Sequence, residues 1–375
     1  MLTIDKIKEF SKKHRAILFF MAGFSFDVVT AHRIDALLGI LHQGLYLTLS
    51  GGLIVLEWLN RRTPIVLSGR VAKVWSYHLE AVHFLLGTLL SLYTFFYFKS
   101  ASLFTSVGFM IFLAGILIAN EFAPVKHHER WGWIARFGLW SLCLISYFTY
   151  LIPILLGYIG TGPFLLALLA STLFVGMVSG LLQRKRTLTS FEKRELWLPV
   201  IVVQVLFTAL YFLRWIPPVP LAVHYIGVYH GVRGISDSDR QNADSIDRDA
   251  RYALVYTRSR WKFWQKGDQA FLARPGDALY GFVQVFSPSR IREEIKLRWL
   301  WKDPRRGYQA ADAISLPIVG GRDQGYRGYM VKNNFSPGDW RLQVETRDGR
   351  ELGRMYFTIE ADPSTEPRTE RVEFR

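Results

Sequence analysis

The chain carries acidic, basic and histidine side chains inside or beside long apolar runs. The first such set consists of Asp27, His32, Arg33, Asp35 and His42. An ionisable group in hydrocarbon is costly unless it is paired, so it marks a proton or substrate site by default. An Asp27–Arg33 or Arg33–Asp35 ion pair that holds two helices together explains the same residues. We favour this structural interpretation, with a proton or substrate site and charges at the membrane boundary as alternatives.

A second set consists of Glu57, His78, Glu80, His83 and Glu121, near the ends of three apolar runs. Glu80 and His83 have the i, i+3 spacing that lets one helix offer two ligands to a metal ion. Structural roles explain these residues more simply. Glu80 begins a run, where a negative charge suits the helix dipole, and Glu57 precedes Arg61 by four residues. We therefore expect no metal and no cofactor.

The elements that position these residues are membrane spans. Half of the 375 residues are hydrophobic, and one span needs about 20 apolar residues of helix. A short first run, preceded by basic residues, is interpreted as a span at 16–31 and not as a cleaved signal peptide. Six further runs follow, at 36–59, 81–98, 103–122, 137–156, 164–182 and 197–216. The sequence predicts seven spans over 16–216, after a basic N-terminal segment at 1–15.

Loop charges orient these spans. The four segments expected on one side hold 17 Lys and Arg residues, whereas the three segments expected on the other side hold 2. Basic residues are retained on the cytoplasmic side. This places the N-terminus in the cytoplasm and everything after residue 216 outside it. We expect a protein of the plasma membrane whose C-terminal part is extracytoplasmic.

The second half has a different pattern. Residues 217–251 are predicted to be a linker, because the stretch 236–251 is strongly polar. From 252 to 361, apolar and polar residues alternate between turn signals such as Pro337-Gly338-Asp339 and Asp348-Gly349. This pattern favours an all-β, immunoglobulin-like antiparallel sandwich, with an open barrel as the alternative. Residues 362–375 are charged, contain two prolines and are predicted to be disordered.

The β-domain lacks the residues for common catalytic sites. It has no His or Cys after residue 230, so it cannot build a Ser-His-Asp or Cys-His apparatus by itself. Its basic residues are dispersed, which argues against nucleic acid as a partner. A binding role is favoured, with four contact candidates suited to anionic or glycan partners: Tyr308, Arg322, Arg327 and Tyr329. The neighbouring glycines, among them Gly320 and Gly325, also fit plain turns with arginines on a solvated face.

Several segments resemble an uncharacterised family of bacterial multi-pass membrane proteins, domain-of-unknown-function family 2914. In the second half they are YGFVQVFSP (280–288), IVGGR (318–322), GYRGY (325–329), PGDWR (337–341) and DGRELGR (348–354). In the first half they are GFSFD (23–27), RID (33–35) and IPPVPL (216–221). The aromatic stretch Trp299-Leu300-Trp301 departs from the expected pattern. The resemblance implies architecture only, and it transfers no catalytic residue. Together with the loop charges, it predicts a bacterial inner-membrane protein with a periplasmic domain.

The sequence therefore predicts a membrane protein that displays a β-sandwich interaction domain outside the cytoplasm. Its partners would be the lipid bilayer and an envelope glycan or protein. The alternative is a membrane-embedded enzyme or transporter with a polar site in the helix bundle and an accessory β-domain.

Overall fold

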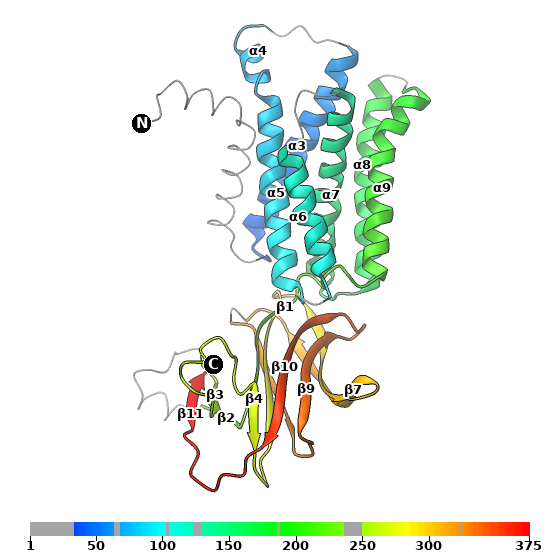
Figure 1. The fold of residues 1–375 in the computed structure, drawn as a ribbon. Coiled ribbons are helices and arrows are strands. Elements are labelled where there is room, and N and C mark those ends of the chain that lie inside the picture. Colours follow the sequence, from blue (N-terminus) through cyan, green and yellow to red (C-terminus); the bar gives the residue numbers. More distant parts are fainter. Residues whose placement is uncertain are drawn as a thin grey trace. The chain divides into compact units, whose positions relative to one another are not determined.

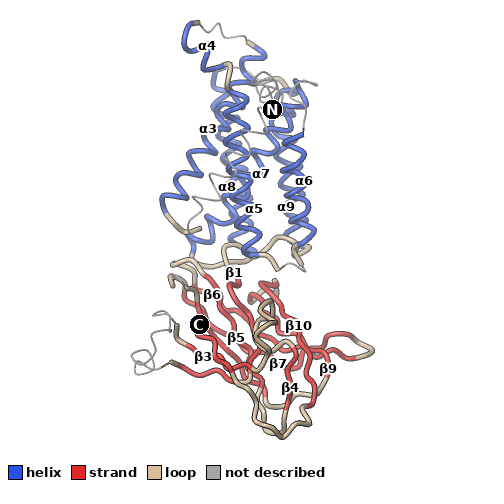
Figure 2. The backbone as a smooth tube through the Cα atoms, turned by 60° about the vertical axis from the view of Figure 1, so that its left-hand side comes forward, coloured by secondary structure: helices blue, strands red, loops and turns tan. Residues whose placement is uncertain are grey.

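A computed structural model of the chain describes residues 34–63, 68–102, 105–122, 129–185, 188–235, 250–322 and 324–375. They form two compact units. One is a helical unit up to Val219, and the other is a β-rich unit from Pro220 to Arg375 that also includes the described residues 100–102. All labelled helices belong to the first unit and all labelled strands to the second (Figures 1 and 2). The predicted span at 16–31, with Asp27, His32 and Arg33, lies outside the described residues.

The helical unit follows the predicted apolar runs. Its described helices are α3 (Leu37–Arg62), α4 (Gly69–Trp75), α5 (His78–Ser100), α6 (Val107–Phe122), α7 (Glu129–Leu156), α8 (Thr161–Lys185) and α9 (Ser190–Phe212). Five of them, α3, α5, α7, α8 and α9, are long and apolar enough to cross a membrane. Helix α6 covers most of the predicted run 103–122 but has only 16 residues. The structure thus confirms a set of helices compatible with a membrane protein.

Helix α7 packs against α3, α8 and α9 through large aromatic side chains. Trp133, Phe137 and Trp140 stack along α7 with ring centroids 5.1 and 5.2 Å apart. The Trp140 indole N–H donates to the backbone carbonyl of Leu47 at 2.8 Å. A Cβ at Gly51 would lie 2.7 Å from this indole ring. Glycine is therefore required at position 51 for the close approach of α3 to α7.

The β-rich unit contains eleven described strands. They are β1 (Ala222–Tyr229), β2 (Gly231–Gly234), β3 (Tyr252–Tyr256), β4 (Ala270–Ala273), β5 (Leu279–Phe286), β6 (Arg292–Asp303), β7 (Gly307–Val319), β8 (Tyr326–Lys332), β9 (Gly338–Thr346), β10 (Glu351–Ala361) and β11 (Arg371–Phe374). Three sheets result, with strand orders β1-β5-β8, β4-β10-β9-β6-β7 and β11-β3-β2. Their strand pairs are antiparallel except β4 with β10, which is parallel.

The three-stranded sheet β1-β5-β8 packs against the five-stranded sheet. A Cβ at Gly281 of β5 would lie 2.8 Å from the Trp299 ring of β6 and 3.0 Å from Leu342 of β9. Leu297, Trp299 and Leu342 are fully buried. Alternate residues of a strand point to opposite faces, so the predicted period of two is confirmed on β6, β9 and β10. The result is a sandwich with its core between these two sheets.

Two predicted boundaries differ from the structure. Strands β1 and β2 arise from the segment predicted as a linker, because the apolar residues of β1 are mostly buried and pair with β5. Strand β11 arises from the tail predicted to be disordered, and it pairs with β3. High charge suggested disorder there, but the charged side chains have partners of opposite sign, as described below. The predicted hairpin turn at Asp348-Gly349 is confirmed, with Gly349 at φ +78°.

Candidate functional site

A buried ion network connects α3 and α7 in the helical unit. Glu57 is 5% exposed and lies in the last turns of α3. Its Oε1 accepts from Arg61 and from Arg136 of α7, each at 2.6 Å. Arg136 is also buried. The predicted Glu57–Arg61 pair is thus confirmed, while Arg136 is a partner that the sequence did not reveal.

A second network connects α3 and α9. Arg62 forms ion pairs with Glu192, at 2.8 Å, and with Glu195. Its guanidinium lies 4.7 Å from the centroid of the Trp58 ring. Glu192 also completes a capping box with Thr189 at the start of α9. Both glutamates are buried, so they serve as structural anchors between the two helices.

The structure describes the side chains of four of the five residues of the second predicted set. His83 of α5 is buried, and Arg136, Glu80 and Glu57 are the charged residues near its ring. His78 of the same helix has Nδ1 2.7 Å from the carbonyl oxygen of Trp75. Glu121 belongs to α6, but its side chain lies outside the described part of the chain. Among the described residues, no three His, Cys, Asp or Glu side chains are arranged to hold a metal ion. The predicted Glu80–His83 pair therefore gains no further ligands there.

The first predicted set is only partly described. Asp35 precedes α3, and His42 is an exposed residue on α3 whose ring lies 4.1 Å from that of Tyr46. The proposed pairing of Arg33 with Asp27 or Asp35 stays a prediction, because residues 1–33 are not described.

The outer face of the five-stranded sheet carries a cluster of tyrosines and arginines, of which Tyr356 is exposed and the others are half-buried. We call it the Tyr–Arg patch, and it consists of Tyr308 (β7), Arg341 (β9), Arg354 and Tyr356 (both β10). The Tyr308 and Tyr356 rings lie 5.5 Å apart. The Arg341 guanidinium lies 4.7 Å from the Tyr308 ring centroid, and Arg354 Nη1 donates to the Tyr356 hydroxyl at 2.9 Å.

The surroundings of the patch shift the pKa values of its two phenols in opposite directions. Burial favours a neutral phenol, but hydrogen bonds from Arg354 and Arg341 outweigh it and lower the pKa of Tyr356. The pKa of Tyr308 is raised by partial burial and by the carboxylate of Asp339. That carboxylate is held 2.9 Å from Lys302. The two rings therefore lie in different electrostatic environments, and the environment of Tyr356 is the more positive one.

The four predicted contact residues do not form one site. Tyr308 begins β7, while Arg322 follows its end, so β7 separates them by roughly 35 Å of extended chain. Arg322 stacks over Tyr326 at 5.6 Å, and Tyr329 lies beside Tyr252 and Tyr280. Arg327 pairs in register with Gln284 of β5. Gly321 and Gly325 have positive φ, which fits their interpretation as turn residues.

Sequence reasoning missed Arg341, Arg354 and Tyr356. Their signal was present, because each alternates with buried residues on β9 or β10 and so points to the outer face. What the sequence did not reveal was the strand order that places β10 and β9 on the same sheet as β7.

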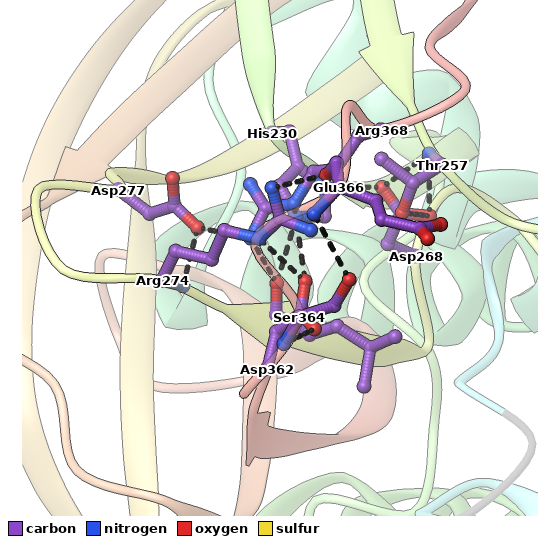
Figure 3. Close-up of polar contacts among 10 residues, drawn as sticks. His230, Thr257, Asp268, Arg274, Asp277, Asp362, Ser364, Glu366 and Arg368 are labelled. Atoms are coloured by element: carbon purple, nitrogen blue, oxygen red, sulfur yellow. Dashed lines mark hydrogen bonds and ion pairs between the residues drawn. The ribbon is translucent and has the colours of Figure 1, made fainter.

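A buried His–Asp pair connects strand β1 to the segment before β4. His230, the last histidine of the chain, has Nδ1 2.7 Å from Asp268 Oδ2, and Asp268 is fully buried (Figure 3). Asp268 also accepts from the backbone N–H groups of Thr257 and Arg258 at 2.9 and 2.8 Å. The other ring nitrogen lies 3.3 Å from the carbonyl of Leu272. Both ring nitrogens thus face acceptors, and the Thr257 hydroxyl also donates to Asp268 Oδ1 at 3.3 Å, so the pair fixes the fold at this point.

The C-terminal segment is held beside this pair by reciprocal charges. Arg368 contacts Asp277 at 2.7 Å, and Arg274 contacts Asp362 at 2.7 Å (Figure 3). Arg274 also donates to the carbonyl of Glu366, and Arg368 donates to that of Leu272. These contacts explain why the charged tail is ordered.

We expect acid to release this segment. Burial alone would raise the pKa of Asp277, but hydrogen bonds from Arg368 and from the Arg274 backbone hold it below its usual 3.8. The pKa of Asp362 is lowered by the Ser364 backbone N–H and by Arg274. Because both pKa values are lowered in the folded state, their stabilisation is complete above about pH 4 and is lost as the pH falls through the lowered values.

Hydrogen exchange of β11 amides between neutral and strongly acidic pH measures this effect, after correction for the intrinsic exchange rate. Protection of β11 should fall at a higher pH than protection of β6. Equal loss in both strands would contradict the role assigned to the two carboxylates.

Several proteins of known structure share a distant similarity with parts of the chain. Among solved structures, an immunoglobulin-like protein from Pseudomonas aeruginosa is 14% identical, with 35% of this chain and 97% of that chain covered, at a TM-score of 0.20. A β-glucosidase from Kluyveromyces marxianus is 11% identical, with coverages of 27% and 14% and a TM-score of 0.18. The alkylpurine DNA glycosylase AlkC from Pseudomonas fluorescens is 10% identical, with coverages of 79% and 83% and a TM-score of 0.19.

No curated protein is significantly similar to the chain, and the similarities to solved structures carry no functional argument. The predicted family resemblance is confirmed in the C-terminal region: residues 292–359, which include the whole Tyr–Arg patch, match the family described as Protein of unknown function (DUF2914).

Proposed function

We propose that this chain is a bacterial plasma-membrane protein whose extracytoplasmic β-domain binds an anionic envelope glycan. The observation that carries the proposal is the Tyr–Arg patch, where two tyrosine rings and two guanidinium groups share the outer face of one sheet.

The patch has the chemistry that a charged sugar requires. Tyrosine rings present flat, rigid surfaces on which the apolar faces of sugar rings stack. Arginine presents a planar fork that matches the oxygens of a carboxylate or phosphate. Arg341 is held over Tyr308, and Arg354 is held by Tyr356 and Glu351, so their positions are preorganised. Preorganised groups lose less entropy on binding.

We expect Arg341→Gln and Tyr308→Ala each to weaken binding of an acidic oligosaccharide by roughly tenfold, as for arginine and tyrosine anchors elsewhere. The measurement is titration of the full-length protein in detergent with a uronic-acid oligosaccharide, followed by calorimetry. A neutral oligosaccharide of the same length tests whether charge is recognised.

Arg305→Gln is the matched control. Arg305 lies in the exposed turn between β6 and β7, so its removal takes away the same charge without touching the patch. Equal losses for Arg305 and Arg341 would indicate a general charge effect and would contradict the proposed site.

The location of the domain rests on the loop charges. The 17 basic residues expected on the cytoplasmic side, against 2 on the other, support an extracytoplasmic position for everything after residue 216. An alkaline phosphatase reporter fused after residue 219 should be active, whereas the same reporter after residue 70 should be inactive. Activity in the reverse pattern would refute this orientation.

A further inference from the structure

A loop between β3 and β4, residues 257–267, exposes three large aromatic side chains. Trp261, Phe263 and Trp264 have exposed fractions of 65%, 81% and 58%. They contact each other, since the Trp264 ring lies 5.3 Å from both Trp261 and Phe263. Single exposed apolar residues are ordinary, but three adjoining aromatic side chains on one loop indicate a surface that something covers.

The loop holds this conformation through its own contacts and its base. Asp268 accepts the backbone N–H groups of Thr257 and Arg258 at one end. At the other end Gly267 has φ +67°, and a Cβ there would lie 2.0 Å from the carbonyl oxygen of Val228. Arg258 Nη1 crosses the loop to the carbonyl of Lys262 at 2.9 Å. These contacts fix the conformation of the loop, which holds the aromatic side chains outward.

Cations alternate with the aromatic residues along this loop. Arg258, Arg260, Lys262 and Lys266 lie within residues 257–267, and no Asp or Glu occurs from 252 to 267. Lys262 lies 5.6 Å from the centroid of the Trp261 ring. The surface of this loop therefore complements a partner that has an anionic outer layer and an apolar region below that layer.

We propose that this loop is an interfacial anchor that inserts Trp261, Phe263 and Trp264 into the headgroup region of an anionic lipid bilayer. Tryptophan prefers the membrane–water boundary, and neighbouring lysines and arginines gain from anionic headgroups. Five helices of this chain can cross a membrane, so a bilayer is present at high effective concentration. The anchor uses residues distinct from the Tyr–Arg patch and does not require the glycan.

A probe at the tip of the loop tests the anchor directly. Phe263→Cys is labelled with nitrobenzoxadiazole in the full-length protein, and the unsubstituted protein corrects for labelling of the buried Cys143. The protein is reconstituted in phosphatidylcholine vesicles with or without phosphatidylglycerol. With phosphatidylglycerol we expect blue-shifted emission, quenching by lipid-borne doxyl groups and a severalfold smaller effect of aqueous iodide.

Three variants make the result specific. The triple substitution Arg260→Gln, Lys262→Gln and Lys266→Gln should remove the response to phosphatidylglycerol. A label at Val319→Cys, which is 57% exposed at the end of β7, should stay accessible to iodide in both membranes. Arg341→Gln should leave the Phe263 label unchanged, which separates this test from that of the glycan site.

A label at Phe263 that stays accessible to iodide and insensitive to doxyl lipids in both membranes would overturn the anchor. So would protection that appears only when the protein-to-lipid ratio rises, which would indicate a second copy of the chain. Protection that requires an added glycan or protein would likewise assign the loop to another partner.

Discussion

Replacement of Glu57 by alanine is expected to destabilise the helical unit by about 3–5 kcal/mol. Glu57 accepts from Arg61 and Arg136, and its removal leaves the guanidinium of Arg136, whose side chain is 10% exposed, without this partner. An uncompensated buried charge is costly because the surrounding helices cannot hydrate it. Unfolding in mixed detergent and sodium dodecyl sulfate, followed by circular dichroism, measures the loss.

A double substitution separates the charge from the packing. Removing both charges, with Glu57→Leu and Arg136→Leu, should restore most of the stability, since a buried ion pair is often replaced by apolar residues at little cost. Arg61→Gln should cost less than about 1 kcal/mol, because its side chain is 28% exposed. If the double variant is as unstable as Glu57→Ala, the ion pair is not the source of the effect.

The same variants address the alternative of a membrane-embedded enzyme or transporter. A stable double variant that has lost the cellular function would indicate that the functional site lies in the helix bundle. A stable double variant with normal function would keep Glu57 and Arg136 as structural residues.

Replacement of Asp268 by alanine is expected to destabilise the β-rich unit by about 3–5 kcal/mol, as for removal of one partner of a buried charged pair. This carboxylate is fully buried and accepts from His230 and from the backbone N–H groups of Thr257 and Arg258. Its loss leaves these groups and the Thr257 hydroxyl without this acceptor, so we expect the base of the aromatic loop to open. The melting temperature of the β-rich unit should fall by roughly 10 °C.

Hydrogen exchange locates the effect. The amides of Thr257 and Arg258 should lose protection in Asp268→Ala before the amides of β6 do. Asp303→Ala is the control, because Asp303 accepts two backbone N–H groups in the turn after β6, in an exposed position. Its removal should cost about 1 kcal/mol. Similar losses of stability for the two variants would show that the burial of Asp268 does not increase the cost of removing it.

Local patterns predicted the elements well. Apolar runs located α3 and α5 to α9, alternation located the faces of β6 and β9, and Asp348-Gly349 located a hairpin, because each signal lies within a few residues. The Glu57–Arg61 pair was predictable for the same reason, since four residues separate its members.

Partners from distant segments were not predictable in this way. Arg136 reaches Glu57 across 79 residues, and Arg62 reaches Glu195 across 133. Many charged residues have suitable signs, and only the packing of α3 with α7 and α9 selects among them. The Tyr–Arg patch and strand β11 were missed for the same reason, because they depend on which strands become neighbours.

The contact of Trp140 with Gly51 has a mechanical consequence. The indole groups of Trp140 and Trp133 donate to backbone carbonyls of α3 at two levels, 2.8 and 3.1 Å away. Sliding α3 along α7 would break both hydrogen bonds and drive a ring into the backbone at Gly51. The two helices therefore behave as one rigid body, and any rearrangement of the helical unit must place its hinge at other helix contacts.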